Sequence, residues 1–186
     1  MTMLIDVCME KDSLWKHEFV DPVQRAAPGS RVVHMSDVTE QDIGEADSII
    51  ICGTALMDNE YMKHWNDFGW LKRTDVPVLG ICAGAHIISK IFGGSICMSN
   101  EIGMVEIRVT ERNDLFRGTF HAYELHNSAA SLPRGFIALA ESDKCLQAFR
   151  HASKDIYGVL FHPEVRNTGT IARFLEKKKK DGPGGI

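Results

Sequence analysis

Residues 76–86 read Val-Pro-Val-Leu-Gly-Ile-Cys-Ala-Gly-Ala-His, and they say more about the fold than any other stretch. The apolar run before Cys82 is typical of a buried strand. Residues 83–92 instead carry isoleucines at helical spacing and stop at Gly93-Gly94. A strand that turns directly into a helix is the repeating unit of α/β proteins. We therefore expect an α/β fold with Cys82 at the turn between these two elements.

Steric requirements explain why glycines stand on both sides of Cys82. Gly80 and Gly84 stand two residues before and after the cysteine, where bulkier side chains would clash if the backbone folded back to expose the thiol. This spacing is that of a nucleophile elbow. The positive end of the following helix favours a thiolate and offers backbone N–H donors to an oxyanion. A buried structural cysteine is the alternative, and this short pattern alone does not decide between the two.

The segments on either side of this turn also alternate between strand and helix patterns. The first half contains strand patterns at 4–8, 31–35 and 48–52, helical patterns around 14–23 and at 61–71, and an acidic segment at 37–45. The second half contains shorter strand patterns at 105–109, 136–139 and 156–160, followed by a helix at 169–176. We expect a mainly parallel open sheet flanked by helices, with added antiparallel strands in the second half.

The composition indicates one ordinary globular domain. The chain has 186 residues, of which 44% are hydrophobic and 25% charged, so a single core is expected. We expect residues 1–176 to form one domain and residues 177–186, a charged and glycine-rich end, to form a flexible tail. The four lysines of this end are typical of a solvated helix terminus rather than of a nucleic-acid or membrane contact.

Charge and cysteine content argue against several classes of protein. A net charge of -4 argues against a broadly basic surface for nucleic acids or anionic membranes. No stretch approaches the roughly 18 apolar residues that cross a bilayer, and the first residues lack a signal-peptide pattern. The five cysteines are odd in number and form no Cys-x-x-Cys pair, which fits neither a disulfide framework nor a zinc ribbon. A cytoplasmic protein with no nucleic-acid or membrane partner is expected.

A base for Cys82 is found in residues 157–164, which read Tyr-Gly-Val-Leu-Phe-His-Pro-Glu. Residues i and i+2 of extended backbone face the same way, so His162 and Glu164 share a side. Pro163 between them keeps His162 out of the helical conformation. Glu164 can then fix the imidazole tautomer while His162 accepts the thiol proton. The sequence therefore predicts a catalytic triad of Cys82, His162 and Glu164.

Residues 80–86 and 157–165 together resemble the paired signature of class I glutamine amidotransferases, which use a Cys-His-Glu triad. The similarity continues through Glu-Leu-His-Asn-Ser at 124–128, Leu-Pro-Arg-Gly-Phe at 132–136, Leu-Ala-Glu-Ser-Asp at 139–143 and Ala-Phe-Arg-His at 148–151. It is strongest to the glutaminase subunits of GMP synthetases. It covers most of residues 47–176 and is weak before them.

The resemblance implies a glutaminase that uses no cofactor. Cys82 would attack the side-chain amide of glutamine, ammonia would leave, and water would release glutamate from a thioester. The family takes its oxyanion donors from the N–H after the cysteine, here Ala83, and from a loop after the third strand, here Gly53 and Thr54. That loop usually holds two glycines and a proline, so Thr54 and Ala55 depart from the family pattern.

Two histidines fall at family positions near the substrate. His86 stands where the family commonly has glutamine, and His126 falls where relatives often carry a histidine facing the substrate or the synthetase. A histidine at a strand end, as expected for His126, is otherwise structural or exposed. Combining His121 and His126 with His162 gives no tight ligand spacing, so no metal is expected.

The resemblance leaves three functions open. Because the remaining length holds no ATP-binding or acceptor-binding module, the first is a glutaminase that passes ammonia to a synthetase partner such as GMP synthetase. The second is a stand-alone γ-glutamyl hydrolase or peptidase, distinguished by its preference for γ-glutamyl peptides over free glutamine. The third is a catalytically silent regulatory subunit, which the changes at Thr54, Ala55 and His86 would favour. Labelling of Cys82 by a glutamine-mimicking electrophile separates the third from the other two.

Overall fold

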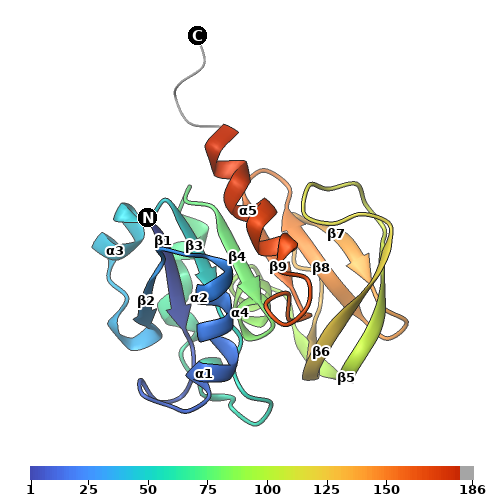
Figure 1. Ribbon diagram of the computed structural model, residues 1–186, viewed down its shortest axis with the longest axis horizontal. Coiled ribbons are helices and arrows are strands. Elements are labelled where there is room, and N and C mark those ends of the chain that lie inside the picture. Colours follow the sequence, from blue (N-terminus) through green and yellow to red (C-terminus); the bar gives the residue numbers. More distant parts are fainter. Residues whose placement is uncertain (181–186) are drawn as a thin grey trace.

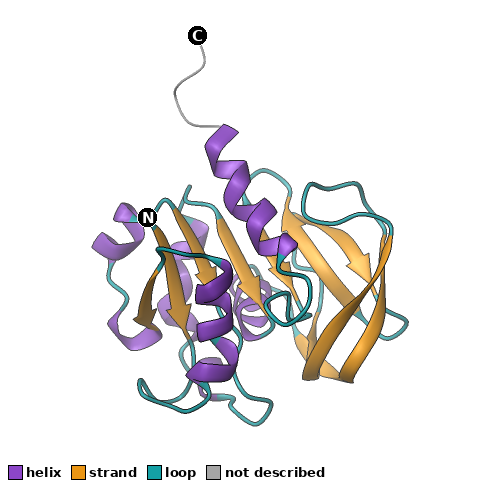
Figure 2. Ribbon diagram, in the orientation of Figure 1, coloured by secondary structure: helices purple, strands orange, loops and turns teal. Residues whose placement is uncertain are grey.

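The computed structural model describes residues 1–180, with side chains described through Lys177. Its strands form one nine-stranded sheet in the order β2-β1-β3-β4-β9-β8-β7-β5-β6, and helices cover both faces of its parallel part (Figures 1 and 2). The strands are β1 (Thr2–Asp6), β2 (Arg31–His34), β3 (Ser48–Ile51), β4 (Val78–Ile81), β5 (Ile96–Val109), β6 (Thr119–Ala130), β7 (Phe136–Glu141), β8 (Leu146–His151) and β9 (Ile156–Val159). The α-helices are α1 (Lys16–Phe19), α2 (Asp21–Ala26), α3 (Glu40–Glu45), α4 (Ala83–Ile91) and α5 (Gly169–Lys180), and the 3₁₀-helices are η1 (Met35–Asp37), η2 (Glu60–Met62) and η3 (Trp65–Lys72).

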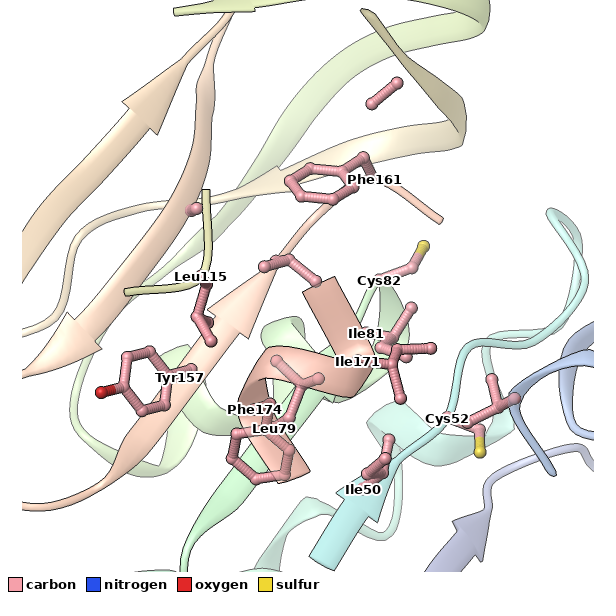
Figure 3. Close-up of a cluster of buried hydrophobic side chains, with 14 of the residues drawn as sticks. Ile50, Cys52, Leu79, Ile81, Cys82, Leu115, Tyr157, Phe161, Ile171 and Phe174 are labelled. Carbon is pink, nitrogen blue, oxygen red and sulfur yellow. The ribbon is translucent and has the colours of Figure 1, made fainter. Parts of the chain in front are cut away.

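Strands β2, β1, β3, β4 and β9 run parallel. Strands β1, β3, β4 and β9 are almost entirely buried, whereas the edge strand β2 is partly exposed. Ile50 belongs to the apolar cluster under α2 and α5 (Figure 3), whereas Ile49 and Ile51 belong to the cluster that includes α4 and the 3₁₀-helices. Successive side chains of a strand point to opposite faces, so a strand covered on both faces reads as a continuous apolar run. This explains the three consecutive isoleucines of β3.

The second half of the sheet is antiparallel. Strand β9 pairs in parallel with β4 on one side and in antiparallel fashion with β8 on the other, and β8, β7, β5 and β6 continue the antiparallel pattern. The predicted strand at 105–109 is the end of the much longer β5, which pairs along most of its length with β6. The expected α/β fold, mainly parallel with added antiparallel strands, is confirmed.

Two of the predicted helices differ from the structure. The helix expected at 61–71 consists of the 3₁₀-helices η2 and η3, because apolar spacing does not separate the two helix types and Gly69 disfavours an α-helix. The helix expected around 14–23 is divided into α1 and α2, with Pro22 in the first turn of α2, where a missing N–H costs no hydrogen bond. Within residues 1–180 no helix has the length and apolar character that crossing a membrane requires.

Two predicted boundaries also shift, and a segment predicted only as acidic contains a helix. Strand β1 ends at Asp6 rather than at residue 8, because the Asp6 carboxylate accepts the N–H of Cys8 at 2.9 Å and turns the chain. The acidic segment at 37–45 contains α3, which begins with a capping box formed by Thr39 and Asp42. Helix α5 continues through Lys180, so residues 177–180 are helical rather than part of a tail. Residues 181–186 lie outside the described residues, and the proposed domain end at 176 stays a prediction.

Replacing Gly84 with alanine should destabilise the protein by roughly 1–3 kcal/mol, because the new methyl group overpacks a closed contact. A Cβ atom at Gly84 would lie 2.3 Å from the carbonyl oxygen of Ile51 on the neighbouring strand. Gly44→Ala in α3 is the matched control, because a Cβ atom there would meet nothing within 4 Å. Urea unfolding should give a lower midpoint for Gly84→Ala and an unchanged or higher midpoint for Gly44→Ala. Equal midpoints for the two variants would contradict the close approach of α4 to β3.

Candidate active site

The site forms at the carboxyl edge of the parallel strands. Strand β4 lies between β3 and β9, and the three parallel strands end at the same edge. The fold therefore brings together Gly53 from after β3, Cys82 from after β4 and His162 from after β9. The N–H of Cys82 donates to the carbonyl of Val159 at 2.8 Å, which ties the turn to β9. This edge is where open α/β sheets bind their ligands.

Cys82 occupies a strained turn at the start of α4. Its backbone has φ 48° and ψ -99°, and it is the only non-glycine residue among residues 1–180 with a positive φ. A Cβ atom at Gly80 would lie 2.5 Å from the backbone of Gly84, so the two glycines let the chain fold back on itself. The Cys82 sulfur lies 3.9 Å from the carbonyl oxygen of Leu125. The geometry expected of a nucleophile elbow is present.

His162 and Glu164 form a buried pair beside Cys82. The Nδ1 atom of His162 lies 2.7 Å from Oε1 of Glu164, and both side chains are almost fully buried. An ionised carboxylate only accepts hydrogen bonds, so Nδ1 carries a proton and Nε2 is left to exchange one. Nε2 is buried and has no hydrogen-bond partner among the described residues. The structure thus places the three predicted triad residues together.

Gly53 explains how closely the histidine approaches the cysteine. A Cβ atom at Gly53 would lie 2.9 Å from Cε1 of His162 and 3.6 Å from Cβ of Cys82. Any other residue at this position would push the imidazole ring away from the sulfur. Gly53 is therefore required by the approach of these two side chains.

The charge state of His162 follows from its neighbours. Burial alone lowers the pKa of His162, but its electrostatic interactions with the Glu164 carboxylate and the Cys82 sulfur, together with the hydrogen bond to Glu164, outweigh this effect. The pKa of His162 consequently lies well above its ordinary value of 6.5. An imidazolium between Cys82 and Glu164 is the favoured state at neutral pH, which suits a nucleophile used as a thiolate.

Asp58 holds the loop that follows β3. Thr54 donates its hydroxyl hydrogen to Oδ2 of Asp58 at 2.6 Å, and the same oxygen accepts the N–H of Met9 at 2.8 Å. Oδ1 of Asp58 accepts the N–H of Glu60 at 3.1 Å. Thr54 has no positive φ, so a non-glycine residue fits there without strain. The departure from the family pattern at Thr54 is thus held in place by a buried carboxylate.

His86 is a neutral, hydrogen-bonded part of the wall. Its Nε2 atom lies 3.1 Å from the carbonyl oxygen of Ser128, which can only accept, so Nε2 carries the proton. The Tyr61 hydroxyl then donates to Nδ1 at 2.8 Å. Burial lowers the pKa of His86 to about 4, which keeps the ring uncharged. His86 therefore joins α4 to η2 and β6.

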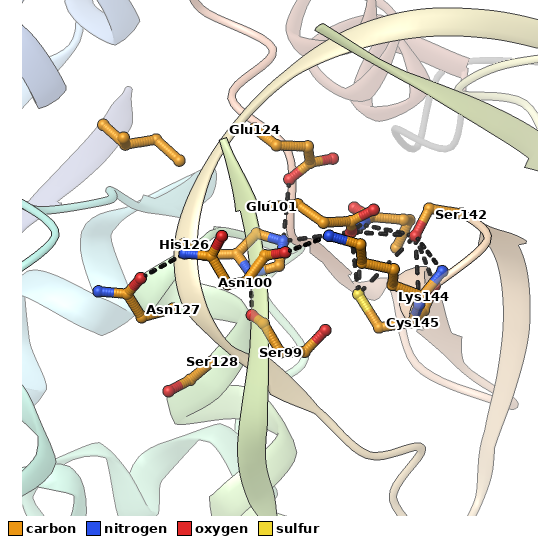
Figure 4. Close-up of polar contacts among 12 residues, drawn as sticks. Ser99, Asn100, Glu101, Glu124, His126, Asn127, Ser128, Ser142, Lys144 and Cys145 are labelled. Atoms are coloured by element: carbon orange, nitrogen blue, oxygen red, sulfur yellow. Dashed lines mark hydrogen bonds and ion pairs between the residues drawn. The ribbon is translucent and has the colours of Figure 1, made fainter. Parts of the chain in front are cut away.

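His126 lies in a buried polar cluster on the antiparallel strands (Figure 4). Its Nδ1 atom donates to the carbonyl of Ser99 at 2.9 Å, and its Nε2 atom lies 3.3 Å from Glu124 and 3.5 Å from Glu101. Burial lowers the pKa of His126, but contacts with Cys145 and Glu124 outweigh it and raise the pKa to about 10. At neutral pH His126 is therefore a positive charge between two carboxylates.

A cavity of about 470 Å³ lies over Cys82, within the size range of small-molecule sites. Five of the predicted residues line it, whereas Gly53, His162 and Glu164 do not. Sequence reasoning missed Asp58 and Tyr61, which also line it, because no short motif marks a loop residue that bonds across the fold. The lining comprises the predicted Thr54, Cys82, Ala83, His86 and His126, together with Ala55, Leu56, Met57, Asp58, Asn59, Tyr61, Met98, Leu125, Asn127 and Ser128.

Known proteins share both the sequence and the fold. The family model for glutamine amidotransferase class-I matches residues 22–180. A glutamine-hydrolyzing GMP synthase subunit from Picrophilus torridus is 34% identical over 178 residues, which cover 89% of this chain and 94% of that protein. The equivalent subunit from Thermococcus kodakarensis is 40% identical over 114 residues, which cover 58% of this chain and 57% of that protein.

Solved structures agree with this assignment at the level of the fold. The crystal structure of a putative GMP synthase subunit from Thermoplasma acidophilum superimposes with a TM-score of 0.82 at 24% identity, covering 96% of this chain and 94% of that chain. A glutamine amidotransferase from Thermotoga maritima gives a TM-score of 0.70 at 21% identity, covering 97% of this chain and 82% of that chain. The resemblance first seen around Cys82 and His162 is confirmed, and the chain belongs to the class I glutamine amidotransferase family.

Proposed function

We propose that this chain hydrolyses glutamine to glutamate and ammonia, with Cys82 as nucleophile, His162 as acid and base, and Glu164 as the residue that orients the imidazole. The observation that carries the proposal is the buried His162–Glu164 pair, bonded at 2.7 Å, beside a cysteine held at φ 48°. Family membership supplies the reaction type, and the geometry supplies the role of each side chain.

The first half of the proposed reaction forms a thioester. The Cys82 sulfur adds to the side-chain carbonyl carbon of glutamine, and the oxygen becomes an oxyanion. Ala83 is the first residue of α4, so its N–H is not used within the helix and is available to the oxyanion. The loop at Gly53 and Thr54 offers the second N–H donor. His162 then gives its Nε2 proton to the departing nitrogen, the C–N bond breaks, and ammonia leaves.

The second half of the reaction releases glutamate. His162 Nε2, now without its proton, accepts a proton from water, and the resulting hydroxide attacks the thioester carbon. The C–S bond breaks and returns the electron pair to the Cys82 sulfur. Glu164 keeps the imidazole in one orientation through both halves. His86 and His126 line the cavity, but each already donates to a main-chain carbonyl, and we assign both to shaping the substrate pocket.

Replacing Glu164 with glutamine should lower kcat for glutamine by roughly 100- to 10,000-fold with a smaller change in KM. The amide keeps the shape of the side chain but removes the charge that raises the pKa of His162. That pKa should fall, so the alkaline limb of the kcat/KM profile should move to lower pH. Steady-state rates measured across pH 5–10 check both effects. Full activity with an unmoved alkaline limb would rule out this role for Glu164.

We further propose that the ammonia passes to a separate synthetase subunit of the GMP synthase type. The relatives from Picrophilus and Thermococcus are each named as one subunit of a glutamine-hydrolyzing GMP synthase. The rim of the cavity exposes two large apolar side chains, Met57 and Met98, with exposed fractions of 79% and 89%. Exposed methionines suit a surface that a partner covers. The free cysteines and the partner fit a cytoplasmic location.

The synthetase partner should raise kcat rather than lower KM. If the loop at Thr54 presents its oxyanion donor fully only when a synthetase is docked, adding the ATP-dependent subunit of a GMP synthase and its acceptor should raise kcat by roughly 100- to 1,000-fold. KM for glutamine should change much less. Ammonia release by the isolated chain and by the mixture measures this difference.

The alternative functions give different results in the same assay. A stand-alone γ-glutamyl hydrolase would turn over γ-glutamyl peptides rapidly and would not respond to any synthetase. A silent regulatory subunit would release no ammonia in either condition. Either result would overturn the proposed partnership.

A further inference from the structure

A cluster of potential metal ligands lies beside the active-site cavity, on the antiparallel strands (Figure 4). Glu101 comes from β5, Glu124 and His126 come from β6, and Cys145 lies in the turn between β7 and β8. Glu101, Glu124 and His126 are at most 4% exposed, whereas Cys145 is half-buried. The site is therefore closed on three sides and reachable from solvent at the cysteine.

The spacing of the ligand atoms fits tetrahedral coordination. One atom each from Glu101, His126 and Cys145 lies within 4.8 Å of the other two. Oε2 of Glu101 is 3.5 Å from Nε2 of His126 and 3.3 Å from Sγ of Cys145. Ligands at ordinary Zn²⁺ bond lengths lie roughly 3.3–3.8 Å apart along the edges of a tetrahedron. Only small shifts would place one ion within bonding distance of all three atoms.

The hydrogen bonds that the described residues form around the cluster leave Nε2 of His126 free. Oε2 of Glu101 instead accepts from Gln147 at 2.7 Å and from Ser142 at 3.0 Å, and a bound ion would replace part of these contacts. Nδ1 of His126 donates to the carbonyl of Ser99 at 2.9 Å, which is the arrangement of a histidine that binds a metal through Nε2. Nε2 itself has no hydrogen-bond partner among the described residues. Both carboxylate oxygens of the fully buried Glu124 also lack a hydrogen-bond partner within the described part of the chain, although Oε2 lies 3.3 Å from Nε2 of His126. Without a metal, the His126 imidazolium is the cation that offsets the charge of Glu124, and a bound divalent ion would take over this role.

We propose that Glu101, His126 and Cys145 bind a divalent cation of the Zn²⁺ type, with the buried Glu124 adding negative charge beside it. A mixed set of thiolate, imidazole and carboxylate ligands suits Zn²⁺ better than Mg²⁺ or Ca²⁺, which prefer oxygen alone. Binding expels the Cys145 thiol proton and the His126 Nε2 proton to solvent, with no change in oxidation state. The ligands are separated by many residues in the sequence, which is why spacing along the chain did not reveal them.

The position of the site indicates a structural role. Glu124 and His126 flank Leu125, whose carbonyl oxygen lies 3.9 Å from the sulfur of Cys82. An ion bound by His126 would join β6 to β5 and to the β7–β8 turn behind the cavity wall. It would stabilise this wall in the absence of glutamine or of a partner. The inference does not rest on the proposed glutaminase activity.

The test uses the full chain with Cys82→Ala, which removes the thiol of the active site as a competing ligand. After treatment with a chelator, Co²⁺ is added as a spectroscopic probe. We expect one Co²⁺ per chain, with visible bands of tetrahedral coordination and a thiolate-to-cobalt charge-transfer band in the near ultraviolet. Zn²⁺ should remove these bands by displacement and should raise the thermal unfolding midpoint.

Two further substitutions test the ligand Cys145 and the neighbouring charge of Glu124. Adding Cys145→Ser should abolish the charge-transfer band and weaken Zn²⁺ binding by at least about 100-fold. This loss is larger than the one expected from replacing a residue that only contacts a metal ligand. Cys97→Ser is the matched control, because Cys97 is an exposed cysteine on the same β5 strand as Glu101. Glu124→Gln should weaken binding without removing the charge-transfer band.

Three results would overturn the proposal. The first is the absence of cobalt bands in the folded Cys82→Ala protein. The second is a charge-transfer band that survives Cys145→Ser, and the third is a band that disappears with Cys97→Ser. Circular dichroism of each variant shows whether the loss of a cobalt band is accompanied by unfolding. The rise of the thermal unfolding midpoint on addition of Zn²⁺ is a second measure of metal binding.

Discussion

Replacing Cys82 with serine should lower kcat for glutamine hydrolysis by at least about 1,000-fold, since loss of a nucleophile removes most of the rate that a catalytic triad supplies. Serine has nearly the same shape but is a far weaker nucleophile, even beside His162. It also inherits the same strained backbone at φ 48°, so the fold should be kept. Release of glutamate and ammonia under saturating glutamine measures the loss.

The matched control for Cys82→Ser is Cys97→Ser, because Cys97 is exposed on β5. That variant should keep the activity of the unsubstituted protein. Urea unfolding should give similar midpoints for all three proteins, which separates a chemical effect from a folding defect. Normal turnover by Cys82→Ser would remove Cys82 from the mechanism, whatever its backbone geometry.

Replacing His162 with alanine should cause a loss of kcat comparable with that of Cys82→Ser, and the double variant should lose no more than either single variant. Residues that act as one catalytic unit show this strong non-additivity, because removal of either member already disables the unit. Glu164 makes its hydrogen bond at 2.7 Å to the ring that alanine lacks. Single-turnover and steady-state rates for the three variants measure the coupling.

A second substitution guards against unfolding of His162→Ala. The imidazole is buried between Phe19 and Tyr123, with ring-centroid distances of 5.6 Å and 6.5 Å, so alanine leaves a cavity and an unpaired carboxylate. His162→Gln fills more of this space and retains a donor for Glu164. It should keep more stability than alanine while losing a similar share of activity. If the losses from Cys82 and His162 substitutions multiplied, the two residues would not act together.

The triad could be predicted from sequence because each part depends on local geometry. Gly80 and Gly84 indicate a sharp backbone turn. A Cβ atom at Gly80 would lie 2.5 Å from the backbone of Gly84, and one at Gly84 would lie 2.3 Å from the carbonyl oxygen of Ile51 on the adjacent strand. His162 and Glu164 are only two residues apart, but the extended backbone expected there was wrong: they lie in a turn after β9, in which the N–H of Val165 donates to the carbonyl of His162 at 3.2 Å. The pairing of the two side chains was therefore predicted correctly from their short separation, although the backbone that brings them together is a turn. The parallel order of β3, β4 and β9 then brings these local features to one edge.

The long-range contacts that hold the residues around the site could not be predicted in the same way. Asp58 bonds to Met9, which precedes it by 49 positions, and His126 contacts Glu101 across the register of β5 and β6. Such contacts depend on strand pairing and loop paths that no spacing rule gives. The 3₁₀ geometry of η3 was missed because apolar side chains three and four residues apart fit both helix types.

The structure also explains how the protein accommodates Thr54 and His86, which depart from the family pattern. Thr54 has a hydroxyl that bonds to a buried carboxylate, so this loop is fixed by a side chain where relatives rely on glycine and proline. His86 is neutral and bonded on both ring nitrogens, so it acts as part of the wall. Neither change disturbs the His162–Glu164 pair.

Covalent capture of Cys82 tests the central claim most directly. A glutamine analogue with a chloroketone in place of the side-chain amide presents its reactive carbon where the scissile carbonyl would lie, and the thiolate displaces chloride to form a stable thioether. Peptide mass spectrometry should locate one adduct on Cys82, formed more slowly in the presence of excess glutamine and far more slowly in His162→Ala. An adduct on another cysteine, or labelling of Cys82 at the same rate with glutamine present and with His162 replaced, would contradict a glutamine site built on this pair.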